Sequence, residues 1–159
     1  MTFLIWVFFS SFGFLYVLFG IMQEICFQEN FNEWNEEKQK LHQRVDINSF
    51  YIQPRQIWYV KLWINVWFEQ NGKRDFQRPV LVIQRIWILF FVVPLSTKNK
   101  LNPYYYKLTS VSFDKTSLAI LSQVRIVDKR RFINPIGLVS EEEILIIKKL
   151  LKDIYLTGV

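Results

Sequence analysis

Short β-branched and aromatic runs, separated by turn-forming residues, fill the chain from Gln56 onward. Five such runs follow one another: QIWYVKL, PVLVIQR, ILFFVVPL, YYYKLTSV and SLAILSQVRIV. Gly, Pro, Asn, Asp or Lys stand in the breaks, as is usual where strands end. No helical pattern lies between the runs, which argues against a doubly wound α/β fold. The pattern therefore predicts a mainly β domain, a small and strongly bent antiparallel sheet or barrel.

A helix is predicted on each side of these strands. Residues 30–45 are polar, lack Gly and Pro, and carry apolar side chains at near-helical spacing, namely Phe31, Trp34, Leu41 and Val45. Near the other end, Ser140 and Glu143 form an S-x-x-E capping box ahead of an apolar run. We expect the C-terminal helix to pack on the sheet through one face, formed by Ile144, Ile147, Leu151 and Ile154.

The N-terminal segment carries no charge over residues 1–22. Its apolar part, residues 3–22, is about as long as a bilayer-spanning helix of roughly 20 residues, which predicts a membrane anchor. Two alternatives stay open: an upstream extension ahead of a true start at Met22, and a signal peptide, which the missing basic start and cleavage site disfavour. We divide the chain into this segment at 1–22, a helical extension and linker at 23–53, and a β domain at 54–157.

The scarcity of Cys and His limits the chemistry of the chain. One cysteine, Cys26, excludes an internal disulfide, and one histidine, His42, leaves too few ligands for a Cys/His zinc site. The sequence holds no glycine-rich phosphate-binding motif. The acidic residues of the strand region are far apart in sequence, which disfavours a metal-dependent nuclease. We therefore expect no metal and no cofactor.

The strand region is both basic and aromatic. The chain has 20 Lys and Arg against 14 Asp and Glu, a formal net charge of +6. Cations that follow a phosphate backbone, interleaved with rings on which bases stack, are typical of single-stranded nucleic-acid binding. The alternative is a solvated surface over an aromatic core.

Six pieces of the β domain occur in an ordered series: IWYVKL, FEQNGK, QRPVLVI, VVPLSTK, AILSQVRIVDKRR and IG-L-S-EEE. In this order they resemble the MazF/PemK family of toxins from type II toxin–antitoxin systems, and RPVLVI and SQVRIVDKRR are the most specific. The resemblance implies an SH3-like antiparallel barrel with a C-terminal helix, a homodimer, and a metal-independent endoribonuclease that cuts single-stranded RNA, such as mRNA, at short sequences. It also implies a cognate antitoxin, operator DNA bound through the antitoxin complex, and a cytoplasmic location unless residues 3–22 tether the protein to a membrane.

The same resemblance places the catalytic arginine of the family on Arg78, in QRPVLVI, and its catalytic hydroxyl on Ser96, in VVPLSTK, with Thr97 as the alternative. The implied step is attack of the RNA 2′-OH on the adjacent phosphorus. A planar guanidinium is suited to stabilise the charge that grows there, but its high pKa makes it a poor base. Each residue also has a structural alternative to a catalytic role. Arg78 is then only a charge at a loop edge, and Ser96 only ends a strand.

Further residues are expected to support catalysis or to bind RNA: Glu69, Gln70, Thr97, Lys73, Lys98 and Arg85. We expect Arg125 and Asp128 to form a structural ion pair at a strand end. Arg130 and Arg131 are expected to contact RNA or to remain solvated.

Three tryptophans stand where the family has glycine or a polar turn: Trp63, Trp67 and Trp87. Indole side chains are costly at turns that need a positive φ. The chain is also poor in glycine, with 5 in 159 residues. Because some bacteria read UGA as glycine, we hypothesise that these three positions are glycine in the native host.

Two other classes of function remain open at this point. One is a non-catalytic toxin, or a nucleic-acid- or protein-binding module on the same barrel. The other is a small membrane-tethered interaction protein. Retained growth arrest in Arg78→Ala and Ser96→Ala variants would favour the first of these over an enzyme.

Overall fold

The computed structural model describes residues 31–45, 51–62, 76–98, 102–111 and 116–157. The chain divides into two compact units, Met1–Lys40 and Leu41–Val159. Residues 31–42 are helical, as predicted. The apolar segment at 1–22 lies outside the described residues, so both the membrane anchor and the predicted domain boundaries stay predictions. None of the helices in the described ranges is long and apolar enough to cross a membrane.

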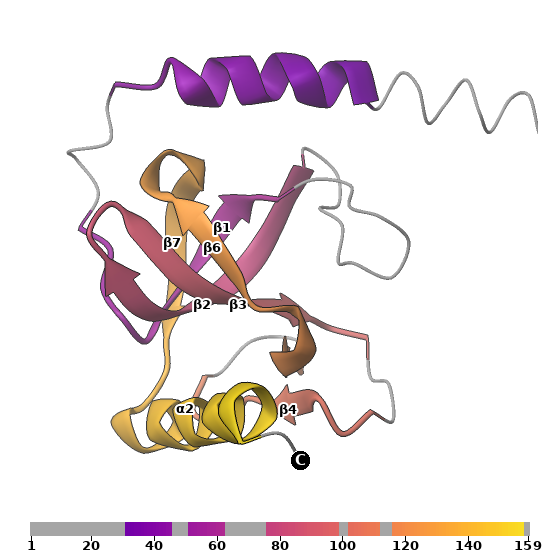
Figure 1. The fold of residues 1–159 in the computed structure, drawn as a ribbon, viewed down its shortest axis with the longest axis vertical. Helices are drawn as coiled ribbons and strands as arrows, with labels where there is room; N and C mark the ends of the chain where they lie inside the picture. The colour runs from indigo at the N-terminus through magenta and orange to yellow at the C-terminus, as the bar shows by residue number, and fades with distance from the viewer. Residues whose placement is uncertain (1–30, 46–50, 63–75, 99–101, 112–115, 158–159) are drawn as a thin grey trace, which may run out of the picture. The chain divides into compact units, whose positions relative to one another are not determined.

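Seven antiparallel strands form the sheet of the second unit (Figure 1). They are β1 (Gln56–Lys61), β2 (Gln77–Ile86), β3 (Leu89–Ser96), β4 (Tyr105–Lys107), β5 (Leu118–Ile120), β6 (Arg125–Asp128) and β7 (Phe132–Leu138). Their order is β4-β5-β3-β2-β1-β7, and β6 pairs with β3 beside this path. The predicted mainly β, antiparallel architecture is confirmed, whereas closure of the sheet into a barrel stays a prediction.

The predicted division into five strands is wrong. The run SLAILSQVRIV is two strands, because the 3₁₀-helix η3 (Leu121–Gln123) separates β5 from β6. The sequence pattern also missed β7, whose Pro135 and Gly137 are typical of loops. Pro135 pairs with Trp58 at a register shift between β1 and β7, an irregular position of the kind where a strand tolerates proline.

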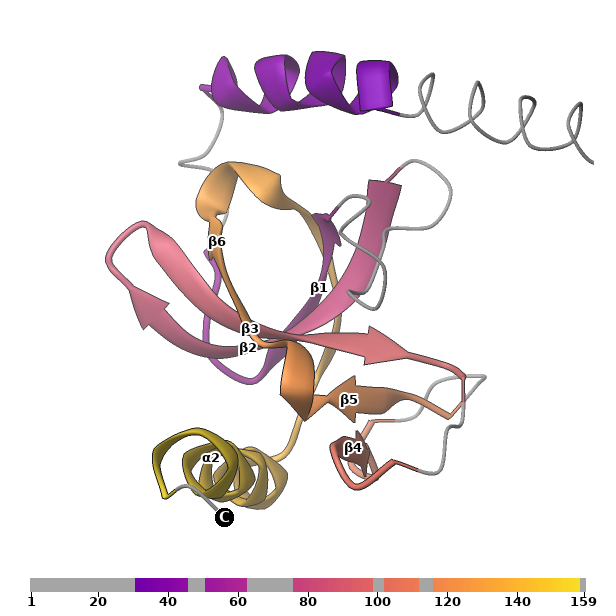
Figure 2. The same ribbon diagram turned by 45° about the vertical axis from the view of Figure 1, so that its right-hand side comes forward.

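The two faces of the bent sheet support two separate cores. The first core lies between the sheet and the helix α2 (Glu141–Leu156), and it includes Ile57, Leu81, Val93 and Ile147 (Figure 2). The second core lies on the other face and includes Trp58, Val60, Val80, Val82, Phe90, Val92, Val127 and Phe132. A strand that is buried on both faces needs apolar side chains at every position. This explains the uninterrupted apolar segments PVLVI and FFVV.

The turn between β2 and β3 consists of Trp87 and Ile88, because Ile86 pairs with Leu89. Trp87 has φ 56° and is 80% exposed. Favoured two-residue hairpin turns need a positive φ at the first loop residue, where glycine fits without strain. The turn is therefore consistent with a native glycine at position 87, while Trp63 and Trp67 lie outside the described residues.

Replacing Trp87 with glycine is expected to raise the free energy of unfolding by about 1 kcal/mol. The left-handed conformation costs a non-glycine residue roughly 1–2 kcal/mol, and the exposed indole contributes little burial. Urea denaturation measures the change. Ile88→Gly is the matched control in the same turn, and it is expected to lose stability because Ile88 has no positive φ. A loss of stability in both variants would contradict the turn argument, and a native peptide whose mass contains Trp87 would end the codon hypothesis.

The helix α2 begins where the sequence predicts. The hydroxyl of Ser140 accepts a hydrogen bond from the backbone N–H of Glu143 at 3.1 Å. A capping box also requires the Glu143 side chain to accept a hydrogen bond from the backbone N–H of Ser140, and this half of the prediction is wrong. The backbone N–H of Ser140 instead donates to the hydroxyl of Ser110 at 2.9 Å. The Glu143 carboxylate accepts hydrogen bonds from other residues. Tertiary partners thus replace the local contact.

Glu143 ties α2 to the segment between β4 and β5. Its side chain is 3% exposed and accepts hydrogen bonds from the backbone N–H of Thr109 at 2.6 Å, the Thr109 hydroxyl at 2.9 Å, the backbone N–H of Ser110 at 3.0 Å and the Ser110 hydroxyl. Burial alone raises the pKa of Glu143, but these hydrogen bonds favour the carboxylate and bring the pKa below its ordinary value.

Glu143→Gln is expected to lower the free energy of unfolding by about 2 kcal/mol at pH 7, because a neutral amide replaces a charged acceptor of several hydrogen bonds. Since the pKa is lower in the folded state, the contribution of the carboxylate is complete above about pH 4.3 and is lost as the pH falls through the folded-state pKa. The difference between the two proteins should therefore shrink in acid. Denaturation between pH 7 and pH 3 measures it, with the exposed Glu142→Gln as control. If the difference in the free energy of unfolding between Glu143→Gln and the unmodified protein stayed constant with pH, the stabilising role of the Glu143 carboxylate would be refuted.

Candidate active site

Arg78 is the second residue of β2 and lies at the end of the second core. It pairs with Val60 across β1 and is only 8% exposed, so it is not a loop-edge charge. Its guanidinium Nη1 donates to the backbone carbonyl of Leu95 on β3 at 3.4 Å. A buried guanidinium is thus held against the end of the neighbouring strand.

Ser96 is the last residue of β3 and follows Leu95, whose carbonyl accepts the hydrogen bond from Arg78. The pairing of β2 with β3 ends at Val80 and Pro94, and a continuation of this register by two residues would bring Arg78 opposite Ser96. Alternate residues share one face of a strand, so both side chains continue the face that carries Val80 and Val92 of the second core. The Ser96 hydroxyl is half-buried and accepts a hydrogen bond from the backbone N–H of Lys98 at 3.1 Å.

The other predicted site residues are not all near this pair. Thr97 and Lys98 follow Ser96 and are exposed. Arg85 lies seven residues from Arg78 along β2, roughly 23 Å at the usual rise of a strand, and its Nε donates to the Trp87 carbonyl at 2.9 Å. Arg85 is therefore not brought to the site. Glu69, Gln70 and Lys73 lie outside the described residues.

Burial and neighbouring ionisable groups both act on Arg78. Burial lowers the pKa of the Arg78 guanidinium from its ordinary value, Tyr105 acts in the opposite direction, and Arg125 lowers the pKa further. Burial likewise lowers the pKa of Arg131, Asp128 opposes this shift, and Arg125 again adds to it. A partly desolvated guanidinium of this kind is suited to bind an anion.

Sequence reasoning did not include Arg125 and Tyr105 in the site. Arg125 was expected to pair with Asp128, and that ion pair stays a prediction. The carboxylate of Asp128 accepts a hydrogen bond from the backbone N–H of Arg130 at 2.8 Å, which caps the 3₁₀-helix η4 (Lys129–Arg131). The sequence RIVD held a signal for the position of Arg125. Arg125 and Val127 are two residues apart in a strand, so both lie on the face that the buried Val127 turns toward the second core.

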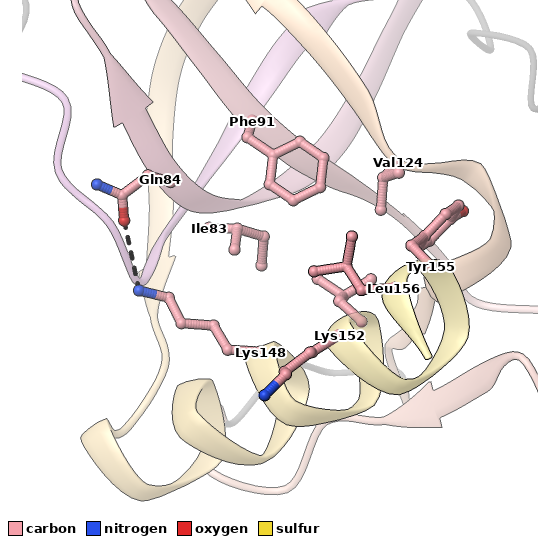
Figure 3. A pocket seen from close by; sticks show the side chains of 9 residues that line it. Ile83, Gln84, Phe91, Val124, Lys148, Lys152, Tyr155 and Leu156 are labelled. Carbon is pink, nitrogen blue, oxygen red and sulfur yellow. Dashed lines mark hydrogen bonds between the residues drawn. The ribbon is translucent and has the colours of Figure 1, made fainter. Parts of the chain in front are cut away.

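A separate cavity of about 520 Å³ lies between α2 and the opposite face of the sheet (Figure 3). It is lined by Ile83, Gln84, Phe91, Val124, Lys148, Leu151, Lys152, Tyr155 and Leu156. Lys148 Nζ donates to Gln84 Oε1 at 3.5 Å on its rim. Arg78 and Ser96 do not line it. In the described part of the chain no three His, Cys, Asp or Glu side chains are grouped so as to hold a metal ion.

Residues 53–155 match the sequence model of a protein family, which is described as "PemK-like, MazF-like toxin of type II toxin-antitoxin system". The chain belongs to this family. The predicted resemblance is thereby confirmed over more than half of the sequence. No curated protein sequence matches the chain.

Solved structures of MazF proteins are similar to this MazF-like toxin in fold. MazF from Deinococcus radiodurans (Form-I) is 15% identical, with a TM-score of 0.56 over 67% of this chain and 97% of that chain. The MazE–MazF structure (Form-II) from the same organism is 13% identical, with a TM-score of 0.51 over 70% and 99% of the two chains. A mycobacterial endoribonuclease in complex with its cognate antitoxin is 14% identical, with a TM-score of 0.48 over 64% and 92%.

Because Arg78 is buried, its guanidinium loses hydration on folding, which opposes stability. Arg78→Met, which keeps a long side chain without the charge, is expected to raise the free energy of unfolding by about 1 kcal/mol. Urea denaturation tests this. The control is Arg55→Met, which removes a 2.7 Å ion pair with Glu141 and a hydrogen bond to the Val139 carbonyl and should lower stability. The argument fails if Arg78→Met is less stable than the unmodified protein.

Proposed function

We propose that this MazF-like toxin is a metal-independent endoribonuclease that cuts single-stranded RNA at short sequences. The observation that carries the proposal is the buried Arg78 guanidinium, whose Nη1 donates to the carbonyl of Leu95, the residue before Ser96. A guanidinium and a hydroxyl on one face of adjacent strands are able to hold the non-bridging oxygens of one phosphodiester.

The reaction is an internal transfer at phosphorus. The 2′ oxygen of the ribose forms a bond to the adjacent phosphorus, the bond from phosphorus to the 5′ oxygen of the next nucleotide breaks, and the 2′ proton is lost. A proton on the departing 5′ oxygen completes the step, so the products are a cyclic phosphate and a free 5′-OH. We assign no residue as the general base.

Arg78 stabilises the negative charge that grows on the phosphoryl oxygens, which is the main contribution a preorganised cation makes to such a step. Arg78 is also the proposed proton donor to the departing 5′ oxygen. Ser96 donates a hydrogen bond to the phosphate or positions the 2′-OH. It is preferred to Thr97 because it is half-buried on the face of Arg78, whereas Thr97 is exposed.

The proposal also includes the assembly that the family suggests. The sheet closes as an SH3-like barrel, two copies form a homodimer, and a cognate antitoxin restrains the toxin in the cytoplasm, where the complex binds operator DNA. The solved MazE–MazF structure supports the antitoxin as partner. The formal net charge of +6 would attract an acidic antitoxin segment.

Cleavage of a defined single-stranded RNA in EDTA, with mapping of the ends, tests the activity. Arg78→Ala is expected to lower kcat by about 10²–10³-fold and Ser96→Ala by about tenfold or more, since each removes a group that stabilises the transition state. Thr97→Ala is the matched control and should retain activity. Cleavage that is lost in EDTA would refute the metal-independent mechanism. Growth arrest retained by both Arg78→Ala and Ser96→Ala would show a non-catalytic toxin instead.

A further inference from the structure

The end of β3 pairs with two short strands that extend the sheet beyond the second core. β5 pairs with β3, and β4 pairs with β5 on its other side (Figure 2). Ser96 pairs with Leu118, and Leu118 pairs with Lys107. Residues that stand directly opposite one another in antiparallel strands have their side chains on the same face of the sheet. The hydroxyl of the candidate site therefore lies in one row with a lysine; we refer to Ser96, Leu118 and Lys107 as the serine row.

The neighbouring row shows which face the serine row occupies. It consists of Leu95, Ala119 and Tyr106, which pair in the same order. Leu95 and Ala119 are buried in the first core, and Tyr106 packs against that core. Successive residues of a strand point to opposite faces, so the side chains of the serine row point away from the first core. Ser96 and Lys107 therefore share the face of the sheet that is opposite to α2.

Ser96 and Lys107 are close enough to contact one strand of RNA. Neighbouring strands lie about 4.8 Å apart, so two steps across the sheet place the two Cα atoms about 10 Å apart. Leu118 between them is buried, whereas Ser96 is half-buried and Lys107 is exposed. The row thus presents a hydroxyl at one end and an ammonium group at the other. A lysine ammonium binds phosphate as a point charge on a flexible stem.

A tyrosine stands on the same face, beside Lys107. Tyr105 precedes Lys107 by two residues in β4, and alternate residues of a strand share one face. Tyr105 is half-buried, which fixes it in the sheet and leaves part of it accessible. Tyr106, between the two, packs against the first core and does not belong to this surface. A cation beside an aromatic ring is the combination that holds the phosphate and the base of a single strand.

We propose that Lys107 binds the RNA phosphodiester next to the scissile one, and that Tyr105 stacks on a base of the same strand. The proposal rests on the proposed RNA-cleaving function and deepens it, because it adds a surface that holds the substrate beside Ser96. The serine row begins at the hydroxyl that the proposed reaction uses, so the strand held at Ser96 is the ligand within reach of Lys107. Lys107 and Tyr105 therefore act on substrate binding more than on the chemical step.

The first test measures the affinity of the full chain for uncleavable 2′-O-methyl RNA that spans the mapped cleavage site. Lys107→Gln is expected to weaken binding about fivefold at about 0.1 M salt and to reduce the slope of log K against log salt by about 0.7, the contribution of one phosphate contact in single-stranded nucleic acid. Lys107→Arg should retain both values. Lys149→Gln, which removes an exposed charge from α2, is the matched control and should change neither. In cleavage, Lys107→Gln should raise KM more than it lowers kcat.

The second test separates stacking from packing at Tyr105. Tyr105→Phe keeps the ring and should bind the same RNA as tightly as the unmodified protein. Tyr105→Leu keeps an apolar side chain without a ring and is expected to weaken binding about tenfold. Urea denaturation compares the stability of the two variants, so that a loss of binding is attributed to the ring and not to unfolding.

A third measurement replaces the phosphates one at a time and does not depend on the stability of a variant. A neutral methylphosphonate at the linkage next to the scissile one should weaken binding to the unmodified protein, and Lys107→Gln should be insensitive to it. The inference is overturned if no linkage besides the scissile one affects binding, if Lys107→Gln leaves the affinity and salt slope unchanged, or if Tyr105→Leu binds as well as Tyr105→Phe. RNA cleavage by the unmodified protein would stand in each of these cases. An unmodified protein that neither binds nor cuts RNA would overturn the proposed function and this inference together.

Discussion

The antiparallel register between β2 and β3 determines both cores and the candidate site at once. Leu81 and Val93 face α2, whereas Val82 and Val92 face the second core. A slip of one residue would turn every side chain of one strand to the opposite face. It would also separate Arg78 from Ser96. Packing on both faces therefore enforces the geometry that the proposed chemistry needs.

That enforcement matters because the burial of Arg78 opposes folding. A guanidinium that is 8% exposed loses hydration when the sheet forms. Apolar burial on both faces of the strands opposes this cost and holds Arg78 in position. The Arg78 guanidinium is thus held in place by the fold itself, which is the condition that the proposed electrostatic stabilisation of a transition state requires.

The buried carboxylate of Glu143 supports the site from the other side of the sheet. It fixes the segment at Thr109 and Ser110 to α2, and this segment follows β4. Through Lys107, β4 pairs with Leu118 of β5, and Leu118 pairs with Ser96. The helix N-terminus is therefore connected through two short strands to the strand end that carries the hydroxyl.

Local patterns determined a large part of this protein. Alternation and turn residues predicted the antiparallel strands, and Ser140 predicted the start of α2, because a strand period and a helix cap depend on residues within a few positions of one another. The family motifs also selected Arg78 and Ser96 as a pair. Tertiary structure alone decided the split of SLAILSQVRIV by η3, the strand β7 around Pro135, and the bonding of Glu143 to Thr109 and Ser110 in place of its own helix end. It also decided that Arg131 donates a hydrogen bond to the carbonyl of Lys61, 70 residues away in the sequence. The physical reason is that pairing partners and buried charges come from distant parts of the chain, and their energies depend on burial and neighbours that no local pattern encodes.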